Sequence, residues 1–327
     1  MTKVFISTVP FSNLNQLPLE LLNNLGIEYK INPLHRKLTE KELVNLAVDC
    51  DVIIAGTEPI TDYVMENTKK LKMISRVGIG LDNIDLNAAK KRGIKVSYTP
   101  DAPSPAVAEL TICLILSVLR SIHLSNVEIH NGEWKRYFGK RVADCTIGII
   151  GLGRIGTRVL NRLLVFGTPR LLVNDNEPNK SLNRKFKLDW VDKETIYRES
   201  DLISLHIPLS RETKNMINKK ELLMMKSDAA IVNTSRGGII NENDLYDVMH
   251  DGHLSGAAID VFDKEPYYGK LNKIDRCLLT AHMGSMSVDC RNLMELEATQ
   301  EAIRFLTGKK LKSEAPQEEY LLQKLTP

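Results

Sequence analysis

One stretch of the chain, residues 147–175, constrains the fold more than any other. An apolar, strand-like run at 147–150 leads into Gly151-Leu152-Gly153-Arg154-Ile155-Gly156, and a helical pattern follows. About twenty residues after the third glycine, a second apolar run ends in Asp175. Glycines alone mark many turns. Glycines between a strand and a helix, with an acid at the end of the next strand, are typical of a dinucleotide-binding βαβ unit.

Each part of this pattern has a physical reason. Gly151 permits a tight turn, Gly153 lets the backbone approach a pyrophosphate, and Gly156 lets helix and strand pack closely. The helix N-terminus presents unpaired N–H groups and a partial positive charge to phosphates. Asp175 suits a ribose 2′-hydroxyl and repels a 2′-phosphate, so the sequence predicts NAD rather than NADP as the cofactor.

Length and composition narrow the class of protein. A chain of 327 residues exceeds one ordinary core and predicts two domains. A net charge of +3 without a basic stripe argues against nucleic acid as a partner. Five scattered cysteines, never in C-x-x-C spacing, argue against a disulfide framework or a metal site and predict a cytoplasmic location. The longest apolar segment, 106–119, is shorter than the roughly 20 residues of a membrane span, so we expect a buried helix and no membrane.

Short strand-like runs alternate with helical patterns along most of the chain, which predicts parallel α/β sheets. The expected strands of the first hundred residues are 3–9, 27–31, 52–55, 73–77 and 95–98. Three prolines, Pro100, Pro103 and Pro105, then interrupt the pattern and predict a domain boundary. A helix at about 288–306 is expected to return to the first domain. We therefore predict one domain from 1–100 with 288–327 and another from 101–287, with a cleft between them. The tail beyond Gly308 receives no role.

Polar residues follow three of the expected strands in the second domain. These segments are 233–238, 260–266 and 280–285, and they carry Arg236, Glu265 and His282. The carboxyl ends of parallel strands share one edge of the sheet, where open α/β sheets bind ligands. A cation, a carboxylate and an imidazole are therefore expected to meet there. Asp82 and Asp85 resemble a metal pair, but capping of a turn and a helix start is the better interpretation, and we predict no metal.

With these motifs in order, the chain resembles the D-isomer-specific 2-hydroxyacid dehydrogenases, in the branch that contains D-3-phosphoglycerate dehydrogenase. The similarity covers nearly the whole chain and includes residues 77–85, 106–111, 151–156 and 206–209 besides the three segments above. It implies a Rossmann NAD-binding domain, a flavodoxin-like substrate domain, and a homodimer formed through the cofactor domain with help from helix 106–119. It also implies hydride transfer between NAD(H) and a small 2-hydroxy or 2-keto acid.

The resemblance implies roles for matching residues. Arg236 would bind the substrate carboxylate and polarise the C2 carbonyl, a task that suits a bidentate guanidinium. His282 would be the general acid in reduction and the general base in oxidation. Glu265 would hold the imidazole and favour its protonated form. The substrate would also meet Arg76 and the backbone at Val77 and Gly78. The remaining cofactor contacts would be Arg154 and Ile155 at the pyrophosphate, His206, Pro208 and Thr213 near adenosine, and Thr234, Asp260, Gly284 and Ser285 near the nicotinamide.

The substrate itself stays open. The branch makes a 3-phosphoglycerate-like acid the leading hypothesis, yet the loop 55–59, where phosphoglycerate dehydrogenases often carry an arginine, has Glu58 instead. Residues 101–105 and Ala281 also depart from the family pattern. Hydroxypyruvate, glyoxylate or a specialised biosynthetic 2-keto acid are the alternatives. A different class, an NAD-sensing co-repressor, would call for an apolar peptide groove or long disordered tails, and the sequence shows neither long tails nor low-complexity segments.

Overall fold

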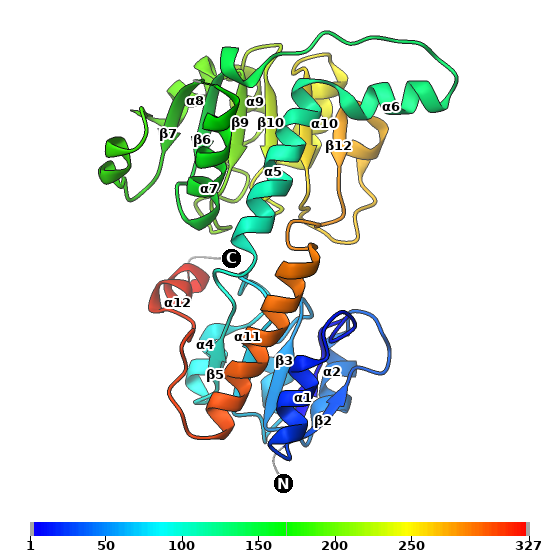
Figure 1. The fold of residues 1–327 in the computed structure, drawn as a ribbon, viewed down its shortest axis with the longest axis vertical. Coiled ribbons are helices and arrows are strands. Elements are labelled where there is room, and N and C mark those ends of the chain that lie inside the picture. Colours follow the sequence, from blue (N-terminus) through cyan, green and yellow to red (C-terminus); the bar gives the residue numbers. More distant parts are fainter. Residues whose placement is uncertain (1–2, 168, 325–327) are drawn as a thin grey trace. The chain divides into compact units, whose positions relative to one another are not determined.

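The structure, a computed structural model, describes residues 3–167 and 169–324, apart from the side chains at 322 and 324. The chain divides into two compact units, residues 1–103 with 285–327 and residues 104–284 (Figure 1). The first crossover falls within the proline-rich segment and the second lies just before helix α11 (Val288–Leu306).

The first unit is built on a five-stranded parallel sheet with strand order β2-β1-β3-β4-β5. Its strands are β1 (Lys3–Ile6), β2 (Glu28–Ile31), β3 (Val52–Ala55), β4 (Met73–Arg76) and β5 (Lys95–Ser97). This order is that of flavodoxin-like sheets, as the resemblance implied. Strand β1 ends before the predicted Val9, since the chain turns away ahead of Pro10, which has no N–H for a sheet.

Helices cover both faces of this sheet, as a parallel sheet requires. One face carries α2 (Glu40–Ala47), α3 (Asp62–Asn67) and α4 (Leu86–Lys91), whose buried residues share one apolar cluster with Phe5, Ile53 and Ile74. The other face carries α11, which packs against β3, β4 and α1 (Leu17–Asn24). Asp85 accepts a hydrogen bond from Ala88 N at 2.8 Å and caps α4, which confirms the helix-start interpretation of this acid.

The C-terminal segment adds to the open edge of the first sheet. Tyr98 N–H donates to Ser313 O at 3.1 Å and Ala315 N–H donates to Val96 O at 2.8 Å. The last helix, α12 (Gln317–Lys324), then packs against α4. The tail therefore covers the exposed hydrogen-bonding groups of β5, a function that its polar sequence did not reveal.

The second unit is built on a seven-stranded parallel sheet with strand order β12-β11-β10-β9-β6-β7-β8. Its strands are β6 (Thr146–Ile150), β7 (Arg170–Asn174), β8 (Asp189–Trp190), β9 (Leu202–Leu205), β10 (Ala230–Asn233), β11 (Gly256–Ile259) and β12 (Cys277–Leu279). Counted from β6 as the first strand, the order is 3-2-1-4-5-6 with one strand added, which is the Rossmann order. The two-residue strand β8 was too short to predict.

Helix α5 (Ser104–Leu119) packs against α7 (Arg154–Leu163), β10 and β11, and most of its residues are buried, as predicted for a core helix. The opposite face carries α8 (Lys193–Glu199), α9 (Lys219–Met224) and α10 (Glu242–His250). Helix α6 (Ile122–His130) has no buried residue, and Figure 1 shows it and the segment after it reaching away from the sheet. Short 3₁₀ turns occur at η1 (Val142–Asp144), η2 (Leu164–Phe166), η3 (Lys180–Arg184) and η4 (Lys270–Lys273).

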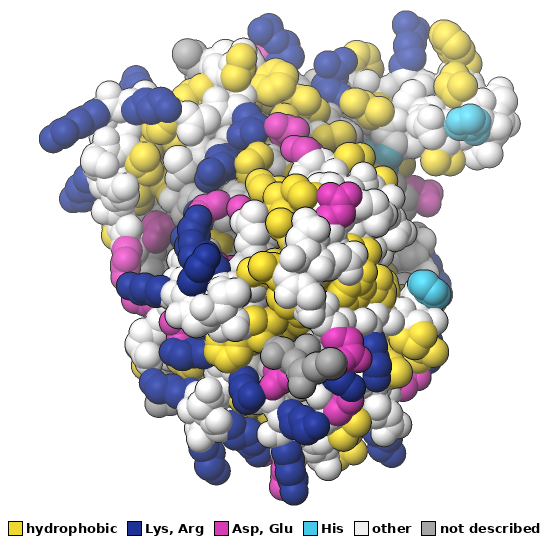
Figure 2. Space-filling model, turned by 60° about the horizontal axis from the view of Figure 1, so that its bottom comes forward, with side chains coloured by type: hydrophobic (Ala, Val, Ile, Leu, Met, Phe, Trp, Pro, Cys, Tyr) yellow, Lys and Arg dark blue, Asp and Glu magenta, His cyan; other side chains and the backbone are white. Residues whose placement is uncertain are grey.

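The surface carries charges of both signs. On the face seen in Figure 2, lysine and arginine side chains are interspersed with acidic and uncharged ones. Within the described residues no single helix is both long and apolar enough to cross a membrane, although α5 and α6 pass that test together as a pair bent by 67°. The same residues contain no group of three or more His, Cys, Asp and Glu side chains arranged to hold a metal ion.

Candidate active site

The glycine loop after β6 is shaped by backbone contacts. Gly151 has φ +96°, and a Cβ there would lie 2.3 Å from His206 O. A Cβ at Gly156 would lie 2.0 Å from Gly151 O. At Gly153 no heavy atom lies within 4 Å of the Cβ position, so this exposed residue leaves open space at the N-terminus of α7. Close packing therefore requires glycine at two positions, whereas open space is what distinguishes the third.

Asp175 joins the end of β7 to this loop. Its Oδ2 accepts a hydrogen bond from Leu152 N at 2.6 Å, and its Oδ1 accepts one from Glu177 N at 2.9 Å. Arg154 is exposed in the first turn of α7 and Ile155 is half-buried beside it. Open space over Gly153, a helix N-terminus and a carboxylate at the next strand end fit the pyrophosphate and ribose of NAD.

The loop after β9 carries the residues expected near adenosine. His206 Nε2 lies 2.8 Å from Ser204 Oγ, since residues two apart on a strand point to the same face. Burial lowers the pKa of His206 to about 3, so the ring is neutral. The Thr213 hydroxyl donates to Pro208 O and accepts from Ser210 N, each at 2.7 Å. These contacts shape the loop, and its contact with adenosine stays a prediction.

Glu265 and His282, seventeen residues apart, meet at the end of the sheet. His282 Nδ1 lies 2.9 Å from Glu265 Oε2 and 3.1 Å from Oε1, and Glu265 Oε1 also accepts from Phe262 N at 3.1 Å. The carboxylate thereby orients the imidazole and leaves Nε2 to exchange a proton with a bound molecule. Both side chains are partly exposed, as such an exchange requires.

Asp260 holds the turn that carries His282. Its Oδ1 accepts from Thr280 Oγ1 at 2.6 Å and from Met283 N at 2.7 Å, and its Oδ2 accepts from Gly284 N at 3.0 Å. The side chain is fully buried, and His282 itself has φ +52°, an uncommon value for a residue with a Cβ. The observed contacts of Asp260 are thus structural, and its predicted contact with the nicotinamide side remains a prediction. Thr234 is likewise engaged, 2.8 Å from Thr111 Oγ1.

Arg236 lies in a tightly packed loop after β10. Its Nη1 donates to Ser235 O at 2.7 Å, and Asn233 Nδ2 donates to Arg236 O at 2.8 Å. A Cβ at Gly237 would lie 1.9 Å from the carbonyl carbon of Phe262, so the loop packs backbone to backbone against the segment after β11. The structure therefore joins the segments of Arg236 and Glu265, as their shared sheet edge predicted.

Gly284 is buried at the end of the second unit, and Ser285 begins the return to the first.

The three residues expected to meet the substrate in the first unit lie at the end of β4. Gly78 has φ +139°, and a Cβ there would lie 2.7 Å from Arg76 Nη1. Val77 N–H donates to Ala55 O at 2.9 Å, and Gly78 N–H donates to Thr99 Oγ1 at 2.8 Å. Both amides already have acceptors, so a substrate carboxylate would have to replace or share the Thr99 hydroxyl. The carboxylate cradle stays a prediction.

Glu58 occupies the same sheet edge. Its side chain is buried, and Oε1 accepts from Gly56 N at 2.9 Å and from the Ser7 hydroxyl. Asn83 Nδ2 donates to the carbonyls of Gly56 and Glu58 at 3.1 and 2.7 Å. The carboxylate is therefore held at the ends of β1 and β3, next to the end of β4. The sequence showed an acid in this loop, but its anchoring to β1 had no local signal.

Comparisons with known proteins agree with this geometry. Residues 112–284 match the model of the D-isomer specific 2-hydroxyacid dehydrogenase NAD binding domain. A hydroxypyruvate reductase of Thermotoga maritima is 37% identical over 276 residues, which are 82% of this chain and 89% of the relative. A D-3-phosphoglycerate dehydrogenase of Methanocaldococcus jannaschii is 36% identical over 277 residues, 83% of this chain and 52% of the relative. This chain belongs to the D-isomer specific 2-hydroxyacid dehydrogenase family.

A solved structure extends the likeness to the whole fold. A D-lactate dehydrogenase of Aquifex aeolicus complexed with NAD and lactic acid has a TM-score of 0.81 and 26% identity, covering 94% of this chain and 96% of that one. The dehydrogenase described here is an NAD-dependent oxidoreductase that acts on CH–OH groups of small 2-hydroxy acids or on the matching 2-keto acids. The cofactor predicted from the glycine loop and Asp175 is confirmed.

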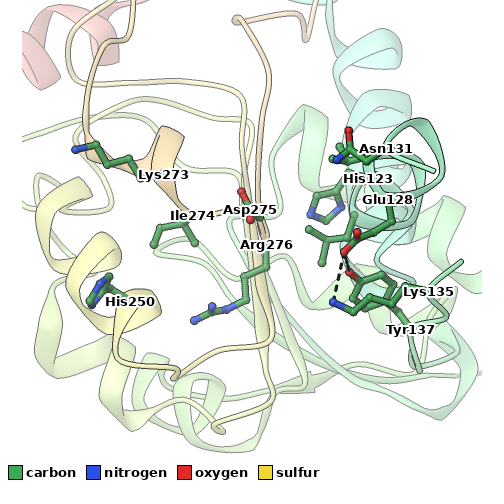
Figure 3. A pocket seen from close by; sticks show the side chains of 12 residues that line it. His123, Glu128, Asn131, Lys135, Tyr137, His250, Lys273, Ile274, Asp275 and Arg276 are labelled. Atoms are coloured by element: carbon green, nitrogen blue, oxygen red, sulfur yellow. Dashed lines mark hydrogen bonds and ion pairs between the residues drawn. The ribbon is translucent and has the colours of Figure 1, made fainter. Parts of the chain in front are cut away.

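A hollow of about 610 Å³ lies elsewhere on the second unit of the dehydrogenase. Figure 3 shows His123, Glu128 and Tyr137 on one side and His250 and Lys273 on the other. Glu128 Oε1 accepts from Tyr137 at 2.8 Å and from Lys135 at 3.4 Å. None of the residues predicted for catalysis or cofactor binding lines this hollow. The hollow therefore lies beside α6, apart from the residues predicted for hydride transfer.

Proposed function

We propose that this dehydrogenase reduces a small, unphosphorylated 2-keto acid of the hydroxypyruvate or glyoxylate type with NADH. The observation that carries the proposal is the buried Glu58 carboxylate at the edge where Val77 and Gly78 would receive substrate. A carboxylate there repels the phosphate dianion of a phosphorylated acid, and low exposure strengthens that repulsion. The named relatives do not decide the matter, because their identities of 37% and 36% are equivalent. The 3-phosphoglycerate hypothesis therefore gains no support beyond the branch resemblance.

Arg236 would bind the substrate carboxylate and polarise the C2 carbonyl. Its loop is held by Asn233 and by close packing at Gly237, which keeps the guanidinium stem in place before substrate arrives. A planar guanidinium donates two parallel hydrogen bonds to a carboxylate, which a lysine cannot do. The charge pair persists while negative charge develops on the C2 oxygen, so it stabilises the transition state.

His282 would donate the proton to the C2 oxygen in reduction and remove it in oxidation. The 2.9 Å contact between Nδ1 and Glu265 fixes the ring orientation and presents Nε2 for this transfer. Asp260 would act indirectly, by holding the turn that carries His282.

The cofactor would lie along the glycine loop, with Gly153, Arg154, Ile155 and Asp175 holding its pyrophosphate and ribose. When bound, its nicotinamide supplies or accepts the hydride at C4. The chain's own contribution is position and charge, because Asp175 ties the glycine loop to the end of β7 through its bond from Leu152 N.

We further propose a homodimer and a cytoplasmic location. We call helix α6 together with residues 131–140 the arm. In the arm, the side chain of Trp134 is 84% exposed and that of Phe138 is fully exposed. Three aliphatic residues of α6 are each about half exposed. Glu128 of the arm pairs with Lys135 within the same chain, so the apolar side chains are what the arm offers to a second copy. Helix α5, expected to contribute, is instead mostly buried within its own unit. The cytoplasmic location is proposed because all five cysteines are unpaired, as is typical of proteins in a reducing compartment.

The test of the proposed reaction is NADH oxidation with hydroxypyruvate, glyoxylate, pyruvate and 3-phosphohydroxypyruvate, with Arg236→Ala as the control. We expect hydroxypyruvate or glyoxylate to give the highest kcat/KM. The variant should lose at least about a thousandfold while NADH binding, measured by fluorescence titration, is retained. A best rate with 3-phosphohydroxypyruvate would contradict the substrate class, and wild-type activity in Arg236→Ala would contradict the mechanism. NADH binding without turnover on any acid would favour an NAD-sensing interaction protein.

A further inference from the structure

The C-terminal segment ends on the loop that connects β4 to α4. After its contacts with Val96 and Tyr98 the chain forms α12, which lies against α4 (Figure 1). This helix brings one amide side chain, Gln323, to residues 81–86. Two parts of the chain more than two hundred residues apart thus meet within the first unit.

Gln323 uses both ends of its amide on this loop. Nε2 donates to Leu81 O at 3.0 Å and to Ile84 O at 2.7 Å, and Oε1 accepts from Leu86 N at 2.8 Å. Leu86 is the first residue of α4, so its N–H is one of those that a helix cannot satisfy internally. The Gln323 amide therefore donates to two carbonyl oxygens and accepts from one N–H at the start of a helix. Among uncharged side chains, only a primary amide combines two N–H donors with a carbonyl acceptor in this way.

The loop held by Gln323 is also the one that leads from Gly78. At its beginning, Gly78 N–H donates to Thr99 Oγ1. In its middle, Asn83 Nδ2 donates to Gly56 O and Glu58 O. Hydrogen bonds thus run from Gln323 through residues 81–86 to Asn83 and on to the turn that carries Glu58. Both proposed substrate-facing parts of the first unit depend on the same loop.

We propose that Gln323 is a positioning residue for substrate binding, which holds the 78–86 loop and, through Asn83, the Gly56–Glu58 turn in the conformation that receives a 2-keto acid. This inference rests on the proposed function, since it assumes that the loop faces the substrate. Removing the amide leaves the Ile84 carbonyl and the Leu86 N–H to find other partners, and Leu81 O keeps only its backbone bond from Ile84 N at 3.1 Å, so the loop then samples other conformations. Pre-organisation of a binding loop acts on substrate affinity in the ground and transition states alike, so KM rises more than kcat falls.

The kinetic test compares Gln323→Met with Gln317→Met. Methionine keeps the length of the side chain and removes its hydrogen bonds, and Gln317 is an exposed glutamine of the same helix. In Gln323→Met we expect KM for the best 2-keto acid to rise about tenfold, with kcat changed less than about threefold. The dissociation constant of NADH should stay the same, because the predicted cofactor residues belong to the second unit. Gln317→Met should match the wild type in all three.

The second measurement is independent of turnover. Amide hydrogen exchange followed by NMR should be at least about tenfold faster at Leu86 in Gln323→Met, while exchange in β1 and β3 is unchanged. Unchanged exchange at Leu86, or faster exchange with an unchanged KM, would overturn the positioning role. Equal acceleration throughout the first unit would also overturn it, because that marks general destabilisation. If the wild type reduces no 2-keto acid, the proposed function fails, and exchange at Leu86 alone decides whether Gln323 holds the loop.

Discussion

At the scale of single residues, buried polar groups determine where the reactive ones point. Asp260 has no exposed surface, so each of its carboxylate oxygens must find donors within the protein. The donors it finds are Thr280 and the backbone of Met283 and Gly284, on either side of His282. A buried carboxylate thereby holds the backbone turn that carries His282, while Glu265 contacts the imidazole itself.

The neutral ring of His206 predicts a pH dependence of stability. Its pKa is lowered to about 3 in the folded protein, against about 6.5 in an unfolded chain. The unfolded chain binds more protons between these values, so stability is fully present above pH 6.5 and is lost as pH falls toward 3. Urea unfolding at pH 7 and pH 5 should show the wild type losing about 2 kcal/mol more than His206→Gln. Equal losses in both proteins would show that His206 is not held neutral.

At the scale of elements, the connection from β6 to α7 has two kinds of glycine. Gly156 is enclosed by the backbone of Gly151, whereas Gly153 faces open space. The first is needed for the strand and helix to pack, and we expect the second to let the cofactor approach. The three-glycine pattern is therefore expected to combine a folding requirement with a binding requirement, and substitutions can separate the two.

Alanine at Gly153 should weaken NADH binding without lowering stability, whereas alanine at Gly156 should lower the stability of the fold. Gly153→Ala has room and an ordinary backbone conformation, so its melting temperature should stay near that of the wild type while NADH binds at least about tenfold more weakly. Gly156→Ala would overlap Gly151 O and should destabilise the protein by more than about 2 kcal/mol. Differential scanning calorimetry and NADH titration measure both effects. A stable Gly156→Ala protein, or normal NADH affinity in Gly153→Ala, would contradict this division.

At the scale of the whole molecule, the arm carries apolar side chains that its own unit does not cover. Trp134, Phe138, Ile122, Val127 and Ile129 are all at least half exposed, within a segment of seventeen residues. Burying such side chains against a second copy removes apolar surface from water at about 25 cal/mol per Å². The arm, rather than the buried α5, is therefore where we place the dimer contact.

Sedimentation velocity tests this placement. The wild type should sediment as a dimer, and Trp134→Ser combined with Phe138→Ser should shift it to a monomer or weaken association by at least about a hundredfold, since large aromatic residues dominate association. The control is Val165→Ser combined with Tyr268→Ser, which removes two apolar side chains of similar exposure outside the arm. A monomeric wild type would contradict the proposed dimer. Dissociation of the control variant alone would place the dimer interface outside the arm.

Much of the architecture could be predicted from the sequence because the relevant signals are local. Alternating strand and helix patterns located most strands, and polar residues at strand ends located Arg236, Glu265 and His282 on one edge of one sheet. The sequence alone could not reveal the roles of Gln323, of Glu58 beside Ser7, or of Asp260 beneath His282. Those roles depend on hydrogen bonds between residues distant along the chain, and folding brings such partners together without leaving a mark in the spacing of either segment. The sequence therefore determined the fold class and the cofactor and predicted the reactive groups, while the tertiary structure decided how each predicted group is held.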